Sequence, residues 1–287
     1  MSSNVTESPD AARYELGDPS SDLQNNLSAD NLKTIQQLAA ELRSNNLKKG
    51  IQAVRSLSAI KAEEADRVLI DSLYNCEQID PLQGEEAQGE ENKQKKAASR
   101  LSAEQKAIFG CTYQYLYTSA STPAKAFIEQ APNGIVKTVS ERDVTYDELQ
   151  ELLIQKNYQA ADKLTTELMC AIAGEDAIKR KWVYFTEVSQ FPNADILTID
   201  TLWRTYSEDK FGWSQQRNLW LRLGKNWERL WPQIKWQTSD GAWTRYPTEF
   251  VWELDSAPVG HLPLFNQLRG VRVMNALLEH PVWATNQ

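Results

Sequence analysis

The residues that most often perform chemistry in proteins are sparse in this sequence. It contains only two histidines, His261 and His280, and three scattered cysteines, with neither type at the spacing of a metal site. Glycine-rich phosphate loops and nucleophile-elbow motifs are absent from the sequence. Carboxylate pairs such as Asp147 and Glu148 fall on polar helix faces, so a solvated surface explains these pairs better than a role in acid–base catalysis. The sequence therefore predicts a protein without catalytic residues and without a metal held by its own side chains.

Two arginines near the C-terminus could serve a binding role instead. Asn266, Arg269 and Arg272 recur every three residues, which places them on one face of a helix. Gly270 lies between the arginines, where it costs about 1 kcal/mol of helix stability relative to alanine. Close approach of another group, such as backbone or a flat ligand, would account for this glycine. Ordinary surface charge is the commoner explanation for such a pattern, so both interpretations stay open.

A run of aromatic residues precedes this helix. Residues 243–252 collect aromatic and large apolar side chains around Pro247, and a loop that holds Tyr246 and Phe250 would offer apolar rings to a planar ligand. The alternative is that the rings close a small core, which aromatic side chains do more often than they bind ligands.

Composition narrows the class of protein. The chain of 287 residues has a net charge of −8, from 31 basic and 39 acidic residues, and lacks a cluster of Lys and Arg. Nucleic acid is therefore not expected as a partner. No run of eighteen apolar residues occurs, which excludes a membrane-spanning helix. All ten tryptophans lie after residue 181, and this shift in composition indicates two units with different roles.

The periodicity predicts a mainly helical fold. We expect a disordered tail over residues 1–30, a helical bundle over 31–130 with a flexible charged insertion at 80–98, and a second unit over 135–287. Acidic residues and the lack of an Arg-rich start argue against a targeting segment.

Local signals mark individual elements within these units. Ser102 with Gln105, and Thr145 with Glu148, match the pattern of a capping box. The clearest helical stripe runs from Tyr158 to Ile172 and should end at Gly174. Asp240-Gly241 predicts a small β-hairpin over residues 235–245, and Pro263 is placed to begin a helix that continues to Glu279.

Several longer segments resemble one known family. The resemblance is ordered and runs from about residue 139 to residue 283. Over this range the chain resembles the genomes-uncoupled family, whose members are tetrapyrrole-binding proteins that stimulate magnesium chelatase in chlorophyll synthesis. Residues 31–130 resemble, more loosely, the helical bundle that cyanobacterial members carry in front. The segments that carry the resemblance include Arg180-Lys-Trp-Val-Tyr-Phe-Thr-Glu-Val-Ser-Gln-Phe-Pro192, Leu197-Thr-Ile-Asp-Thr-Leu-Trp203 and Gly260-His-Leu-Pro-Leu-Phe-Asn-Gln-Leu-Arg-Gly-Val-Arg-Val273.

The resemblance implies a helical, cupped domain that holds protoporphyrin IX or Mg-protoporphyrin IX and has no catalytic residues. It also implies a partner, the large porphyrin-binding subunit of magnesium chelatase, and a monomer in the cyanobacterial cytoplasm. A peripheral contact with the thylakoid membrane is compatible with it, although the sequence has no basic amphipathic helix to support one. By the same analogy, the porphyrin-binding residues are Arg269, Arg272, Tyr246, Phe250, Phe185, Val188 and Asn266.

The sequence departs from the family pattern at three positions. Tyr246 stands where the family usually has Trp, Trp213 where it has Phe, and Gln215 where it has an apolar residue. Tyr246 keeps a flat ring and adds a hydroxyl group. The affinity for a tetrapyrrole, or the tetrapyrrole that is preferred, can therefore differ from that of family members with Trp at this position. The alternatives are a specialised relative that binds bilins, a helical adaptor that binds only proteins, and an aromatic surface for sugars or single-stranded nucleic acid. The acidic balance argues against nucleic acid.

Overall fold

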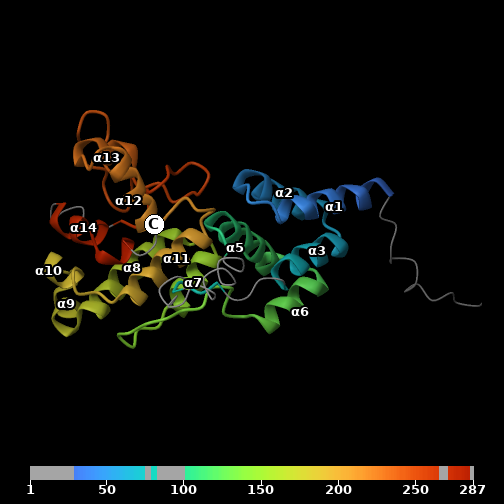
Figure 1. Cartoon of the computed structure of the whole chain (residues 1–287), viewed down its shortest axis with the longest axis horizontal. Coiled ribbons are helices and arrows are strands. Elements are labelled where there is room, and N and C mark those ends of the chain that lie inside the picture. The colour runs from blue at the N-terminus through green and yellow to red at the C-terminus, as the bar shows by residue number, and fades with distance from the viewer. Residues whose placement is uncertain (1–28, 75–78, 83–100, 265–270, 285–287) are drawn as a thin grey trace, which may run out of the picture.

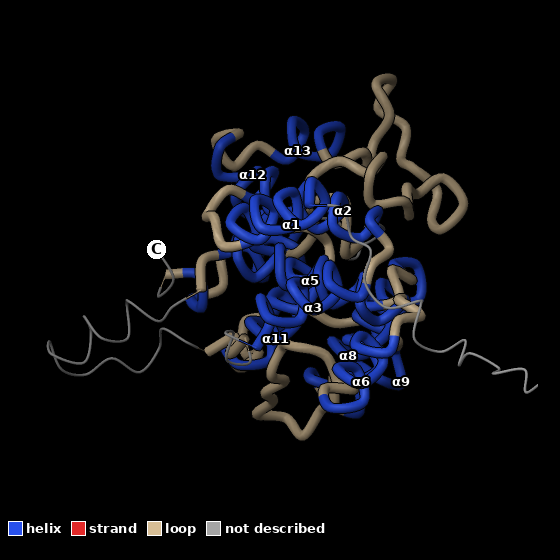
Figure 2. Tube along the Cα trace, turned by 90° about the vertical axis from the view of Figure 1, so that its right-hand side faces the viewer, coloured by secondary structure: helices blue, strands red, loops and turns tan. Residues whose placement is uncertain are grey.

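A computed structural model describes residues 29–74, 79–82, 101–264 and 271–284. The described chain is mainly helical, as the sequence predicts, and Figure 2 shows helices joined by loops. The helices are α1 (Ala29–Leu42), α2 (Leu47–Ile60), α3 (Glu63–Tyr74), α5 (Ala103–Thr118), α6 (Thr122–Gln130), α7 (Asp147–Ile154), α8 (Tyr158–Ala173), α9 (Glu175–Arg180), α10 (Phe185–Val188), α11 (Asn193–Thr205), α12 (Trp213–Arg222), α13 (Trp227–Gln233), α14 (Val271–Leu278) and the 3₁₀ helix η2 (Pro281–Trp283).

The first helices of the chain lie on one side of the molecule and the last helices lie on the other. Figure 1 shows α1, α2, α3 and α6 on one side and α8 to α14 on the other, with α5 between them. Helix α5 packs against α2 and α3 on one side and against α11 and α7 on the other. Because a single helix contributes to both sides, the buried apolar side chains form one continuous core.

Local sequence signals explain where several helices begin and end. Ser102 caps α5 as predicted, since its hydroxyl accepts the Gln105 amide at 3.2 Å and the Gln105 side chain accepts the Ser102 amide at 3.1 Å. Helix α8 ends at Gly174, whose φ of +109° favours glycine. The capping box predicted at Thr145 is wrong. Helix α7 begins at Asp147, because Tyr146 is buried and its hydroxyl donates to Asp195 at 2.5 Å.

The predicted hairpin reduces to one antiparallel bridge between Gln237 and Trp243. The amides of Trp236 and Gln237 donate back to the carbonyl of Trp231 in α13, at 2.9 and 3.3 Å, so they are not available to a strand ladder. The other bridge among the described residues is parallel and joins Ile79 to Val136.

Three predicted boundaries fall elsewhere. Helix α1 begins at Ala29, inside the predicted tail, and the rest of that tail lies outside the described residues. Asp80 belongs to the predicted charged insertion, yet it pairs with Lys137 at 3.3 Å; residues 83–98 lie outside the described part. Pro263 does not begin a helix, because its carbonyl accepts the Gln216 side chain at 2.9 Å and holds the backbone in a bend.

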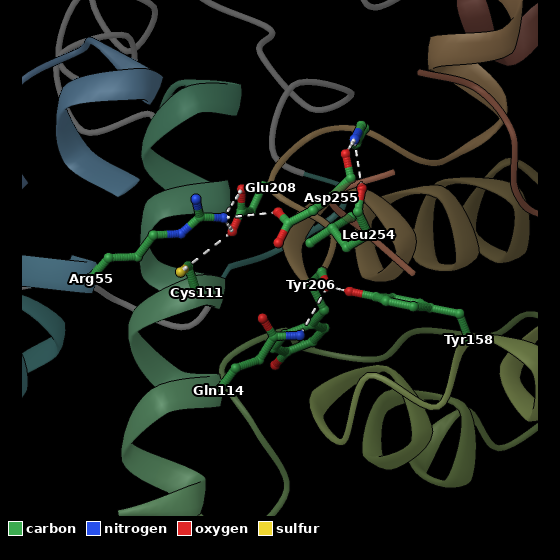
Figure 3. A network of polar contacts seen from close by, with 9 residues as sticks. Arg55, Cys111, Gln114, Tyr158, Tyr206, Glu208, Leu254 and Asp255 are labelled. Atoms are coloured by element: carbon green, nitrogen blue, oxygen red, sulfur yellow. Dashed lines mark hydrogen bonds and ion pairs between the residues drawn. The ribbon is translucent and has the colours of Figure 1, made fainter. Parts of the chain in front are cut away.

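A polar network joins the two sides of the molecule (Figure 3). Arg55 of α2 forms ion pairs with Glu208 at 2.9 Å and with Asp255 at 3.3 Å. Beneath them, Gln114 of α5 and the Tyr158 hydroxyl of α8 both donate to the carbonyl of Tyr206, each at 2.9 Å. The Gln114 bond attaches α5 to the end of α11, and the Tyr158 bond attaches α8 to the same carbonyl; breaking either leaves a buried polar group without its partner.

Candidate functional site

The structure brings two of the predicted site residues together at the contact between α10 and α14. Phe185 begins α10 and Arg272 lies in the first turn of α14, 87 positions further along the chain. The guanidinium carbon of Arg272 lies 5.7 Å from the centre of the Phe185 ring, within the range of a cation–π contact. Phe185 nevertheless keeps 40% of its surface exposed. An aromatic ring and a cation thus face solvent side by side.

An open depression lies over this pair. It has a volume of about 340 Å³ and is lined by Phe185, Val271, Arg272, Asn275 and Ala276. Phe185, Val271 and Ala276 supply the apolar part of its lining, which we call the apolar floor, while Arg272 and Asn275 supply polar groups. A shallow apolar surface with one cation at its edge suits a flat, apolar molecule that carries an acidic group.

Short-range contacts hold Phe185 in place. The Tyr184 amide donates to Glu187 at 2.7 Å, and Glu187 pairs with Arg180 at 2.7 Å, which fixes the start of α10. Val188, the last residue of α10, is fully buried in the core. Val188 therefore does not line the depression.

Several apolar side chains that the sequence did not single out are also exposed in α9, in α14 and directly before α10. Tyr184 is 44% exposed, and the centre of its ring lies 4.4 Å from the guanidinium carbon of Arg180. Ile178 in α9 and Val271 in α14 are exposed as well. The sequence signal that could have revealed this exposed aromatic surface is the pair Trp182 and Tyr184, which lies directly before Phe185 in a segment without a helical stripe of apolar residues.

The predicted aromatic residues form a separate cluster in residues 236–252, which we call the aromatic loop. Tyr246 is 41% exposed, whereas Phe250 is only 6% exposed and packs on Tyr246, Trp252 and His261. In this structure Phe250 closes a small core, the alternative that the sequence left open. Neither ring lines the depression over Phe185.

His261 fixes the base of the aromatic loop. Its Nε2 accepts the amide of Val251 at 3.0 Å and its Nδ1 lies 2.7 Å from the carbonyl of Ile234, so the proton belongs on Nδ1. The Trp236 indole donates to the His261 carbonyl at 2.8 Å. Through these contacts His261 anchors the turn at the base of the aromatic loop.

The loop should therefore lose support from His261 in acid. Burial lowers the pKa of His261 below its ordinary value of 6.5, so the stability that the neutral ring contributes is complete above pH 6.5 and is lost as pH falls through the lowered pKa. We expect His261→Gln to lower the free energy of unfolding by about 2 kcal/mol at pH 7.5, and by less at pH 5. Urea unfolding of both proteins at the two pH values measures this, and an equal difference at both would contradict it.

Two of the predicted residues, Asn266 and Arg269, lie outside the described residues. Within the described part, no three His, Cys, Asp or Glu side chains gather where they could hold a metal ion. None of the helices described here combines the length and apolar character that crossing a bilayer requires.

Comparison with known proteins places the chain in a family. The GUN4-like family model matches residues 139–281. The uncharacterized protein ycf53 of Porphyra purpurea is 44% identical over 177 residues, which cover 61% of this chain and 74% of that protein. The chain belongs to the GUN4-like family.

Further relatives and one solved structure each match about half of the chain. A Ycf53-like protein of Synechocystis is 49% identical over 153 residues, which are 53% of this chain and 65% of that protein. The chloroplastic tetrapyrrole-binding protein of Arabidopsis thaliana is 38% identical over 147 residues, 49% of this chain and 56% of that protein. The solved structure of GUN4 from Chlamydomonas reinhardtii is 36% identical, with a TM-score of 0.48, and covers 52% of this chain and 94% of that one. The sequence match thus spans between about half and three quarters of these curated proteins.

Proposed function

We propose that this chain is a non-catalytic tetrapyrrole-binding protein whose ligand is protoporphyrin IX or Mg-protoporphyrin IX. The pairing of Phe185 with Arg272 over an open apolar floor is the observation that carries the proposal. Membership of the GUN4-like family, and the name of the Arabidopsis relative, support the choice of ligand.

The physical properties of a porphyrin match this arrangement. It is a flat apolar disc with two propionates on one edge. Burying on the order of 400 Å² of the ring yields about 10 kcal/mol, against roughly 4–15 kcal/mol for association, so affinity depends on a preorganised floor. A solvent-exposed pair between arginine and propionate adds only about 0.2–1 kcal/mol. Arg272, together with Arg269 as the second cation, would orient the acidic edge, while the apolar floor, to which Phe185 contributes, supplies most of the affinity.

The full proposal extends to a partner and a location. The bound tetrapyrrole would be handed to, or received from, the large porphyrin-binding subunit of magnesium chelatase, and the protein would stimulate that enzyme. We place this activity in the cyanobacterial cytoplasm, and a peripheral contact with the thylakoid membrane is compatible with it. Rates of magnesium insertion by purified chelatase, with and without the protein, check this part of the proposal.

Protoporphyrin IX should bind the purified chain, and two spectroscopic signals should show the binding. We expect its Soret band to shift and the tryptophan emission to fall, because all ten tryptophans lie between residues 182 and 283. Absorption and fluorescence titrations at micromolar protein measure both signals. Biliverdin in parallel tests the bilin alternative. No change in either spectrum with either pigment would contradict tetrapyrrole binding and favour the protein-binding adaptor.

A further inference from the structure

Five of the ten tryptophans form a continuous row of rings, which we call the tryptophan stack. The row begins in α12, continues through α13 and ends in the aromatic loop, and its members are Trp220, Trp227, Trp231, Trp236 and Trp243. The ring centres of Trp220 and Trp227 are 4.8 Å apart, and those of Trp227 and Trp231 are 5.1 Å apart. From Trp231 the distance is 5.6 Å to Trp236 and 5.7 Å to Trp243. The rings therefore follow one another from Trp220 to Trp243, with Trp236 as a side branch.

The two ends of the tryptophan stack have opposite surroundings. Trp220 is only 2% exposed, and the ammonium group of Lys225 lies 5.1 Å from the centre of its ring. Trp243 is 45% exposed. A positive charge on an indole ring is disfavoured at Trp220 by burial and by the neighbouring cation, whereas water solvates such a charge at Trp243. An oxidised ring is therefore more stable at the exposed end than at the buried end.

Apolar packing alone does not explain a tryptophan at the buried end. The indole nitrogen of Trp220 is buried and has no hydrogen-bond partner in the part of the chain that the structure describes. Leaving this group unsatisfied costs free energy that a phenylalanine at the same position would avoid, because phenylalanine has no polar group. Apart from that group, indole differs from a phenyl ring chiefly in losing one electron far more readily.

The buried end of the tryptophan stack is connected to the candidate site. Helix α12, which contains Trp220, packs against α14 (Figure 1). Lys225 pairs with Glu279 at 2.8 Å, and Glu279 accepts a hydrogen bond from the Asn275 side chain at 2.8 Å. Asn275 in turn lines the depression. Glu279 offsets part of the charge of Lys225, so burial is the larger difference between the two ends of the stack.

We propose that the tryptophan stack conducts one-electron oxidising equivalents from its buried end beside α14 to the exposed Trp243. A strong one-electron oxidant, such as a photo-oxidised tetrapyrrole, takes one electron from Trp220. Each ring then takes an electron from the next, so that Trp243 is finally the ring that lacks one. Its indole releases the N–H proton to water, and a soluble thiol or ascorbate returns one electron and one proton. A tetrapyrrole as the oxidant rests on the proposed function, whereas the path itself does not.

A photo-oxidant attached beside Trp220 tests the path without any ligand. Lys225→Cys, combined with Cys76→Ser, provides one reactive thiol for a ruthenium tris-bipyridine label, since the two cysteines in the described part of the chain are buried. Light and an irreversible cobalt(III) electron acceptor convert the label to ruthenium(III), which takes one electron from the protein. Transient absorption should show an indolyl radical, and peptide mass spectrometry locates the oxidised residue.

The oxidation product should form mainly at Trp243. In the same labelled chain, Trp227→Phe and Trp231→Phe should each lose most of this product, because a phenyl ring does not give up the electron that the path requires. Trp252→Phe is the matched control, because Trp252 stacks on Phe250 and not on the tryptophan stack, and it should keep the full yield. Oxidation that remains at the buried end, or an unchanged yield at Trp243 in both variants, would overturn the path.

Circular dichroism and urea unfolding show whether each variant folds. Trp227 is partly exposed, whereas Trp231 is buried. If Trp231→Phe does not fold, Trp227→Phe therefore still decides the question.

A second measurement tests the tetrapyrrole as the oxidant. Under argon, with the same acceptor, illumination of protoporphyrin bound to the native chain should oxidise Trp243, and Trp227→Phe should lose most of this product. Equal yields in both proteins, or none in either, would overturn this source of oxidising equivalents. Failure of the native chain to bind protoporphyrin would overturn the proposed function, and oxidation of Trp243 in the ruthenium-labelled chain would still support the path.

Discussion

Phe185→Ala is expected to weaken protoporphyrin binding about tenfold, more than Arg272→Ala does. The Phe185 ring is 40% exposed in the free protein, so only that part gains from contact with a bound disc, and this is worth about 1–1.5 kcal/mol. The ring also lies 5.7 Å from the guanidinium carbon of Arg272, so its removal frees the arginine that should orient the ligand. Both losses act in the same direction.

Arg272→Ala should weaken binding by only about two- to fivefold, because an exposed pair with a propionate contributes about 0.2–1 kcal/mol. The double variant should lose less than the sum of the two single losses, since the ring and the guanidinium are in contact. Fluorescence-quenching titrations of the three variants measure these affinities.

Tyr184→Ala provides the matched control for the phenylalanine variant. Tyr184 is the preceding residue, exposes a comparable ring and contacts Arg180, but it does not line the depression. We expect its affinity to stay within about twofold of the native value. A larger loss for Arg272→Ala than for Phe185→Ala would show that charge, and not the apolar floor, dominates binding.

Gly110→Ala is expected to cause the largest loss of stability, about 3 kcal/mol or more in the free energy of unfolding. Gly110 lies in α5 where it crosses the end of α11, and a β-carbon there would sit 1.9 Å from the carbonyl oxygen of Thr205. That contact is with backbone, so the two helices would have to separate. Separation would disturb the neighbouring hydrogen bonds from Gln114 and Tyr158 to the Tyr206 carbonyl. The gain of about 1 kcal/mol in helix propensity cannot offset this.

Gly50→Ala is the matched control for this crossing. It is also a glycine within a helix, but its added β-carbon would meet the Cδ1 and Cγ1 atoms of Ile108 at 2.2 and 2.6 Å, and these side-chain atoms can shift more readily than a backbone carbonyl. We expect a loss of about 1 kcal/mol for this variant. Urea unfolding of both proteins compares them, and equal stabilities would contradict the close crossing of α5 and α11.

Local sequence determined much of the helical framework. The cap at Ser102 and the stop at Gly174 depend on groups within a few residues of one another, so they could be predicted without knowing the rest of the fold. The failures at Thr145 and Pro263 have one cause in common. Distant partners hold those backbone segments, through Tyr146 on Asp195 and the Pro263 carbonyl on Gln216.

The identities of candidate binding residues also came from the sequence, through the resemblance of ordered segments, but their surroundings did not. Only tertiary packing places Phe185 beside Arg272 and buries Phe250 against His261. The physical reason is range: helix periodicity and capping act over one or two turns, whereas which rings face solvent depends on helices that meet only after the whole chain has packed.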